Sequence, residues 1–76
     1  MKELIELIVK ALVDHPEEVR ITEVEGDRTA IFELRCHQED LGKVIGKSGK
    51  TVGAIRTLVS TVAARQSKRA MLEVVE

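Results

Sequence analysis

Residues 44–52 read Val-Ile-Gly-Lys-Ser-Gly-Lys-Thr-Val (VIGKSGKTV). Gly46 and Gly49 stand three positions apart, with apolar residues on both sides. Two glycines allow the chain to turn sharply, and they leave no side chain to hold a ligand away from the backbone. We therefore expect a tight loop here that joins two helices.

The halves GKS and GKT each resemble the end of a nucleotide-binding P-loop. A P-loop requires a glycine, four residues and then Gly-Lys-Ser/Thr, placed between a strand and a helix. The first glycine would have to stand where this sequence has Leu41 or Val44, so both registers fail. The preceding segment also has the pattern of a helix rather than a strand. The sequence thus disfavours a mononucleotide site.

A phosphate in a polymer backbone suits the loop better. Free N–H groups at the start of the following helix are expected to point outward, where the helix dipole favours an anion. Lys47 and Lys50 add positive charge beside them, and Arg56 extends the basic edge about two helical turns further on. These residues predict contacts to a nucleic-acid backbone.

Outward from the loop, the apolar pattern predicts three helices and three strands. The helices are expected over residues 2–13, 39–45 and 50–66. The strands are expected over residues 19–25, 29–36 and 70–75. This α-β-β-α-α-β order predicts an α+β fold with helices on one face of a short sheet. The pattern does not fix the direction of the last strand.

The same pattern predicts which side chains face the core. In the first helix they are Leu4, Ile5, Ile8, Ala11 and Leu12. In the helix after the loop they are Val52, Ile55, Val59 and Val62, and in the second strand they are Ala30, Phe32, Leu34 and Cys36. Glu39 and Asp40 are expected in the first turn of the middle helix, where carboxylates meet the positive end of its dipole.

The charge of the chain is divided between its two halves. The 76 residues carry a net charge of −1, but residues 1–40 hold eleven acidic and five basic side chains. Residues 41–76 hold seven basic and only two acidic side chains. This basic half contains the glycine loop, which favours a local anion-binding face on a nearly neutral protein.

Other features indicate a binding protein rather than an enzyme. Cys36 and Ser48 have no evident base to activate them, so we expect no catalytic residue. His15 and His37 are far apart in the sequence and no cysteine pair accompanies them, so we expect no metal and no cofactor. The single cysteine, and the lack of a secretion signal or a 20-residue apolar run, favour a cytoplasmic protein.

VIGKSGKTV resembles the signature of KH domains, which bind single-stranded nucleic acid, and the element order resembles the type II form of that fold. The stretches MKELIELIVKALVDHPEEVRITEVEG, EDLGKVIGKSGKTVGAIRTLV and AARQSKR resemble the KhpA family of bacterial proteins that consist of one KH domain. The resemblance covers the chain essentially from end to end, so residues 1–76 are expected to be a single KH domain.

The resemblance implies RNA binding, with the glycine loop clamping the backbone of about four nucleotides. Val44, Ile45 and Val52 would floor a groove for bases, and the last strand, near Met71 to Val74, would form its opposite wall. The expected RNA-binding residues are Val44, Ile45, Gly46, Lys47, Ser48, Gly49, Lys50, Thr51, Val52 and Arg56.

The resemblance further implies a post-transcriptional regulator or RNA chaperone that forms a homodimer or associates with a larger RNA-binding protein, KhpB (Jag/EloR). An alternative is a dimerisation module with incidental RNA contact. Phe32 is the only aromatic residue and is expected in the core, so recognition cannot rest on aromatic stacking. Whether Arg65, Lys68 and Arg69 contact RNA is left open.

Overall fold

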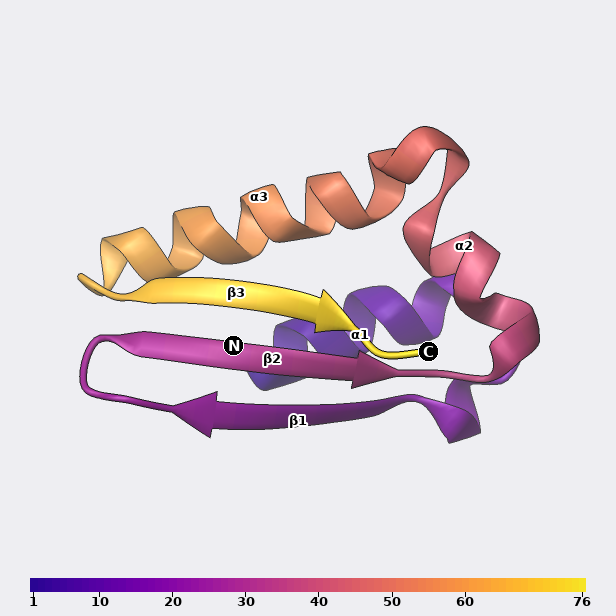
Figure 1. The fold of residues 1–76 in the computed structure, drawn as a ribbon, viewed down its shortest axis with the longest axis horizontal. Coiled ribbons are helices and arrows are strands. Elements are labelled where there is room, and N and C mark those ends of the chain that lie inside the picture. Colours follow the sequence, from indigo (N-terminus) through magenta and orange to yellow (C-terminus); the bar gives the residue numbers. More distant parts are fainter.

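The chain folds in the order α1-β1-β2-α2-α3-β3 (Figure 1). The computed structural model describes all residues, 1–76. The helices are α1 (Lys2–Leu12), α2 (Leu41–Ile45) and α3 (Lys50–Arg65), and the strands are β1 (Arg20–Glu25), β2 (Thr29–Arg35) and β3 (Arg69–Val74). Short 3-10 turns cover Pro16–Glu18, Gln38–Asp40 and Lys47–Gly49. The six predicted elements are confirmed, with small shifts at their ends.

The three strands form one mixed sheet in the order β1-β2-β3. β1 and β2 are antiparallel and make a hairpin in which Glu25 lies opposite Ala30. β3 runs parallel to β2, with Phe32 opposite Leu72. A parallel neighbour requires a crossover connection, and α2, the glycine loop and α3 supply it. The direction of the last strand, which the sequence left open, is therefore parallel to β2.

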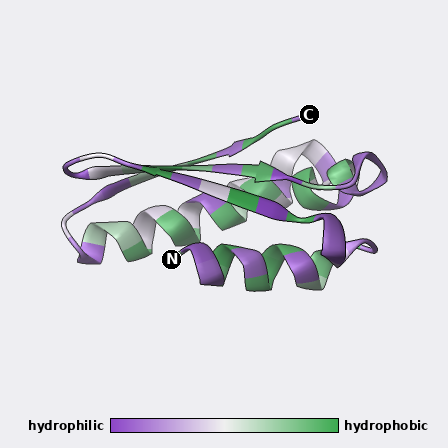
Figure 2. Cartoon of the chain, turned by 90° about the horizontal axis from the view of Figure 1, so that it is seen from below, coloured by the Kyte–Doolittle hydropathy of each residue, from purple (hydrophilic) through white to green (hydrophobic).

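The helices lie on one face of the sheet and leave the other face open (Figure 2). This arrangement confirms the α+β class and is that of a type II KH fold. Fourteen buried apolar residues form the core between the two layers, among them Phe32 and Leu34 from β2 and Leu72 from β3. None of the helices has the length and hydrophobicity that a bilayer span requires.

The predicted buried stripe of α1 is partly wrong. Ile5 and Val9 are completely buried, whereas Leu4, Ala11 and Leu12 are exposed. In this short domain α1 packs mainly against β1, so only a narrow line of side chains four residues apart reaches the core. The prediction missed Val9 because it centred the apolar face on Leu4, Ile8 and Leu12, one residue away from the line through Ile5 and Val9.

The stripe of α3 differs at one position. Val52, Ile55 and Val59 are buried as predicted, but the fourth buried residue is Ala63, and Val62 is only half-buried. Spacings of three and four residues both fit a helix, so the pattern alone does not choose between neighbours. Ala63 lies in the last turn of α3, where its small side chain is buried in the core.

Candidate nucleic-acid interface

The glycine loop takes backbone conformations that explain its two glycines. Gly46 has φ 77° and ψ 171°, a region that only glycine commonly occupies. A Cβ at Gly46 would also meet the side chain of Thr51 and lie 2.8 Å from its backbone nitrogen. Ser48 and Gly49 are both left-handed, with φ 57° and 73°. The loop therefore turns within four residues and delivers the chain directly into α3.

Half of the loop amides are engaged within the protein. Gly46 N–H donates to the Gly42 carbonyl at 2.9 Å, and Gly49 N–H donates to the Gly46 carbonyl at 3.1 Å. Lys47 and Ser48 are exposed, and their N–H groups are not among the donors of the loop and cap hydrogen bonds. The expectation of outward-pointing amides thus applies to the middle of the loop rather than to its glycines.

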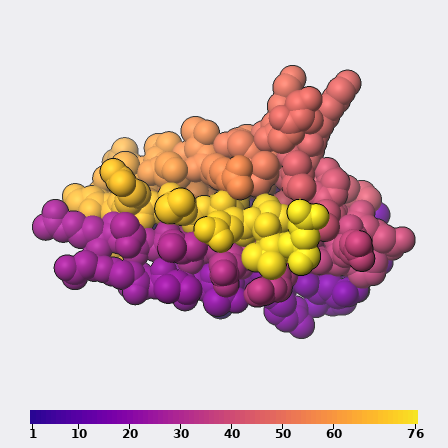
Figure 3. Space-filling view, viewed as in Figure 1, coloured from indigo at the N-terminus to yellow at the C-terminus, as the bar shows by residue number.

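The loop projects from the body of the molecule, as the space-filling view shows at upper right (Figure 3). The exposed side chains of Lys47 and Lys50 have no carboxylate within ion-pair distance. Lys43, one turn earlier, differs because its Nζ lies 3.1 Å from Asp14 Oδ2. That hydrogen bond raises the pKa of Lys43. Lys47 and Lys50 therefore have no partner within the protein and are available to bind an external anion.

A groove lies between α3, the helix that follows the glycine loop, and β3. It encloses about 320 Å³ and is lined by Arg56, Ser60, Ala70, Met71, Leu72 and Glu73. Arg56 Nε donates a hydrogen bond across it to the Leu72 carbonyl at 3.1 Å. Because α3 rises about 1.5 Å per residue, Arg56 lies roughly 10 Å along the helix from the loop.

The strand wall of this groove is an unpaired sheet edge. Arg69 and Val75 donate their N–H groups to carbonyls of Arg28 and Leu34, on the β2 side. Since backbone groups alternate in direction along a strand, those of Leu72 and Val74 point away from β2 and toward the open edge. The Leu72 side chain is buried in the core and its carbonyl accepts from Arg56, so the backbone N–H is the one polar group of Leu72 left to face the groove.

Two of the expected groove residues lie in the core instead. Val44 is completely buried and Val52 is 5% exposed, so neither presents a surface to a ligand. The reason is that α2 is short and packs against both α1 and α3, which turns Val44 inward. Ile45 and Thr51 are half-buried, and the Oγ1 of Thr51 lies beside Gly46. Arg56, expected to extend the basic edge of the loop, lines the groove between α3 and β3.

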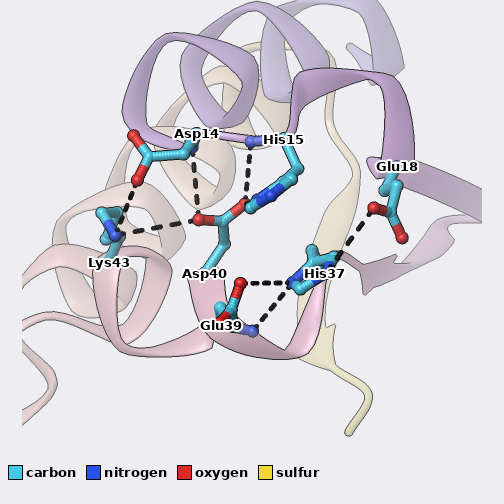
Figure 4. Close-up of polar contacts among 7 residues, drawn as sticks. All are labelled: Asp14, His15, Glu18, His37, Glu39, Asp40 and Lys43. Carbon is cyan, nitrogen blue, oxygen red and sulfur yellow. Dashed lines mark hydrogen bonds and ion pairs between the residues drawn. The ribbon is translucent and has the colours of Figure 1, made fainter.

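A buried carboxylate supports the start of α2, and no local pattern in the chain predicts its burial (Figure 4). Asp40 is completely buried. Its carboxylate accepts hydrogen bonds from the N–H groups of Asp14 and His15 at 3.2 and 3.0 Å, and from His15 Nδ1 at 3.1 Å. Burial alone would raise the pKa of Asp40, but these hydrogen bonds lower it on balance. Asp40 thus fastens the end of α1 to the start of α2.

The two histidines meet in space, contrary to the expectation from their separation in the sequence. The rings of His15 and His37 stack with their centroids 4.0 Å apart and an angle of 14° between their planes. The hydrogen bond to Asp40 raises the pKa of His15. His37 Nδ1 accepts a hydrogen bond from Glu39 N–H at 3.0 Å. The sheet brings the ends of α1 and β2 together, and sequence spacing does not reveal this.

Comparison with known proteins places this arrangement in a family. Residues 2–74 match the family described as KhpA/KhpB, KH domain. The chain is 54% identical over 76 residues to the RNA-binding protein KhpA of Chlamydia pneumoniae, covering 100% of this chain and 97% of that one. It is 48% identical over 75 residues to the protein of the same name from Clostridium perfringens, covering 99% and 100%. No solved structure matches the chain.

Proposed function

The chain belongs to the KhpA/KhpB family of KH domains, and on that basis we propose that it binds single-stranded RNA. The protein would act as a single KH domain that binds and does not catalyse. The observation that carries the proposal is the projecting loop, whose exposed Lys47 and Lys50 have no carboxylate partner in the protein. The relatives named above are called RNA-binding proteins, which supports the same function.

Phosphates would bind at the loop. The N–H groups of Lys47 and Ser48 can donate to phosphate oxygens at the start of α3, where the helix dipole favours negative charge. The ammonium groups of Lys47 and Lys50 can neutralise successive phosphates on either side. Gly46 and Gly49 leave the backbone uncovered, so the sugar-phosphate chain can approach closely.

Bases would enter the groove between α3 and β3. Arg56 and the free N–H of Leu72 offer donors to base edges, and Ile45 and Met71 offer half-buried and exposed apolar surface. Val44 and Val52 would not contact the bases; their packing in the core would fix the position of the loop. Without aromatic side chains to stack on, one such site should bind weakly. A second copy or a KhpB-type partner would raise the affinity by linking two sites.

A charge reversal in the loop tests this function. The double variant Lys47→Asp/Ser48→Asp should lose binding to a fluorescently labelled single-stranded RNA, measured by anisotropy. Circular dichroism should show an unchanged fold, since both side chains are exposed. The matched control Lys2→Asp/Ala11→Asp makes the same change in net charge on exposed positions of α1. Equal binding by the loop variant and its parent would refute the assignment.

Self-association is the second candidate function, and one observation favours it. Leu7 of α1 is 69% exposed and Leu58 of α3 is 51% exposed, so both helices present large apolar side chains to solvent. Burial of such side chains would stabilise a small domain. Analytical ultracentrifugation of the wild type and of Leu58→Lys would test this role. A monomer at all concentrations would leave RNA binding as the single function.

The cellular role follows from these two properties. We propose that the protein acts in the cytoplasm as a post-transcriptional regulator or RNA chaperone. Crosslinking in cells, followed by sequencing of the bound RNAs, would test that role.

A further inference from the structure

The stacked histidines belong to a cluster that the RNA interface does not use. One ring nitrogen each from His15 and His37 and a carboxylate oxygen of Glu39 all lie within 4.8 Å of one another. His37 Nδ1 is 3.8 Å from Glu39 Oε1, and His37 Nε2 is 3.8 Å from Glu18 Oε2. The cluster is at the end of α1 and the start of α2, and Figure 4 shows the His37 ring between Glu18 and Glu39 and the His15 ring beside Asp40.

The protonation of both rings suits metal coordination. Asp40 accepts a hydrogen bond from His15 Nδ1, which leaves the lone pair of His15 Nε2 free. Histidines that bind metals commonly donate their other ring N–H to a carboxylate, which orients the ring and makes it more basic. His37 Nδ1 accepts from Glu39 N–H and so carries no proton, and coordination through this nitrogen would replace that hydrogen bond.

The surroundings also favour a divalent cation. Asp40 is completely buried, and its carboxylate is held in place by two backbone N–H groups. The carboxylates of Glu18 and Glu39 lie on opposite edges of the His37 ring. A dication at this place would offset the negative charge that gathers there, whereas two protonated imidazoles stacked at 4.0 Å would repel each other.

We propose that His15, His37 and Glu39 form a binding site for a divalent transition-metal ion of the zinc class. Two imidazoles and one carboxylate are ligands that Zn²⁺ prefers, and water would complete a tetrahedron. Bond lengths of about 2.1 Å place tetrahedral ligand atoms roughly 3.4 Å apart. The cluster therefore needs a contraction that exposed Glu39 and partly exposed His37 can supply by side-chain rotation. His15 stays held by Asp40, and the His37 ring tilts out of its stacked position toward the ion.

The ion would join two connections of the chain. His15 follows α1, and His37 and Glu39 follow β2, so a shared metal would crosslink the N-terminal helix to the strand that leads into α2. Such a site is independent of the RNA interface, which lies at the other end of α2. The expected consequence is a more stable protein, because the ion binds the folded chain and not the unfolded one.

Titration of the untagged full chain with Zn²⁺ by isothermal calorimetry tests the site. One ion should bind per chain, and the melting temperature should rise by roughly 10–20 °C when free Zn²⁺ reaches about 100 times its Kd. Co²⁺ should give the visible absorption of a tetrahedral complex. His37→Asn and Glu39→Gln should each weaken binding by ~10-fold or more. Both side chains are at least partly exposed, so these variants should fold.

Two matched controls should bind as the wild type does. Glu17→Gln removes a neighbouring exposed carboxylate outside the cluster, and Cys36→Ser removes the only thiol. The proposal is wrong if the wild type binds no stoichiometric ion, or if His37→Asn binds as tightly as the wild type. Loss of binding in Cys36→Ser would assign the ion to the thiol and overturn the proposal equally.

Discussion

Alanine at Gly46 should destabilise the protein much more than alanine at Gly49, although both glycines have positive φ. Gly46 has φ 77° and ψ 171°, and a Cβ there would lie 2.8 Å from the backbone nitrogen of Thr51. Gly49 has φ 73° and ψ 15°, and a Cβ there would meet no atom within 4 Å. The two substitutions thus remove the same glycine freedom but differ in backbone region and contact.

The geometry sets the expected sizes. A left-handed residue with a Cβ costs about 1–2 kcal/mol, and a more restricted unfolded chain offsets about 0.4–1 kcal/mol of that. Gly49→Ala should therefore cost ~1 kcal/mol. Gly46→Ala adds strain of about 1–3 kcal/mol and must also displace the first turn of α3, so we expect ~3 kcal/mol or more. The melting temperature should fall by about 4–8 °C for Gly49→Ala and by at least ~12 °C for Gly46→Ala.

Thermal unfolding followed by circular dichroism measures both effects. Gly42→Ala is the control, because Gly42 lies in α2 and a Cβ there would meet no atom within 4 Å. It should leave the melting temperature unchanged or raise it slightly, since alanine favours a helix over glycine. Equal melting temperatures for Gly46→Ala and Gly49→Ala would refute the proposed loop geometry.

Three further predictions concern charge. Asp40→Asn should lower the melting temperature by roughly 10 °C, because an amide cannot replace the carboxylate as acceptor for three donors. A hydrogen bond with Glu25 raises the pKa of Glu23 above 4.5. The folded chain then holds that proton more tightly than the unfolded chain, so stability is lost as pH rises through the raised pKa. Urea unfolding at pH 4.5 and 7 should show a smaller loss for Glu23→Gln than for the wild type. Finally, the slope of log affinity for single-stranded RNA against log salt should be roughly −2 to −3, as expected for three or four phosphate contacts; a flat response would contradict phosphate binding.

Local patterns predicted the elements well. The alternation of Ala30, Phe32 and Leu34 identified β2 and its buried face, because every second side chain of a strand points to the same side. The spacing of Gly46 and Gly49 predicted a loop between two helices, and the structure places a turn with positive φ at both positions. These features depend on neighbours within a few residues.

Features that depend on distant segments were predicted poorly. Asp40 looked like a residue for the first turn of a helix, but its partners are 26 and 25 positions away, at Asp14 and His15. Val44 looked like a groove residue, but the packing of α2 against two other helices buries it. Pairing across such distances is set by the tertiary fold, and periodicity within one element carries no information about it.

A bound RNA strand should run from the glycine loop into the groove between α3 and β3. Titration of ¹⁵N-labelled protein with a short single-stranded RNA, followed by NMR of the backbone amides, tests it directly. The largest shift changes should occur at Lys47, Ser48 and Leu72. Changes confined to the open face of the sheet, at Val24 and Ile31, would contradict the claim.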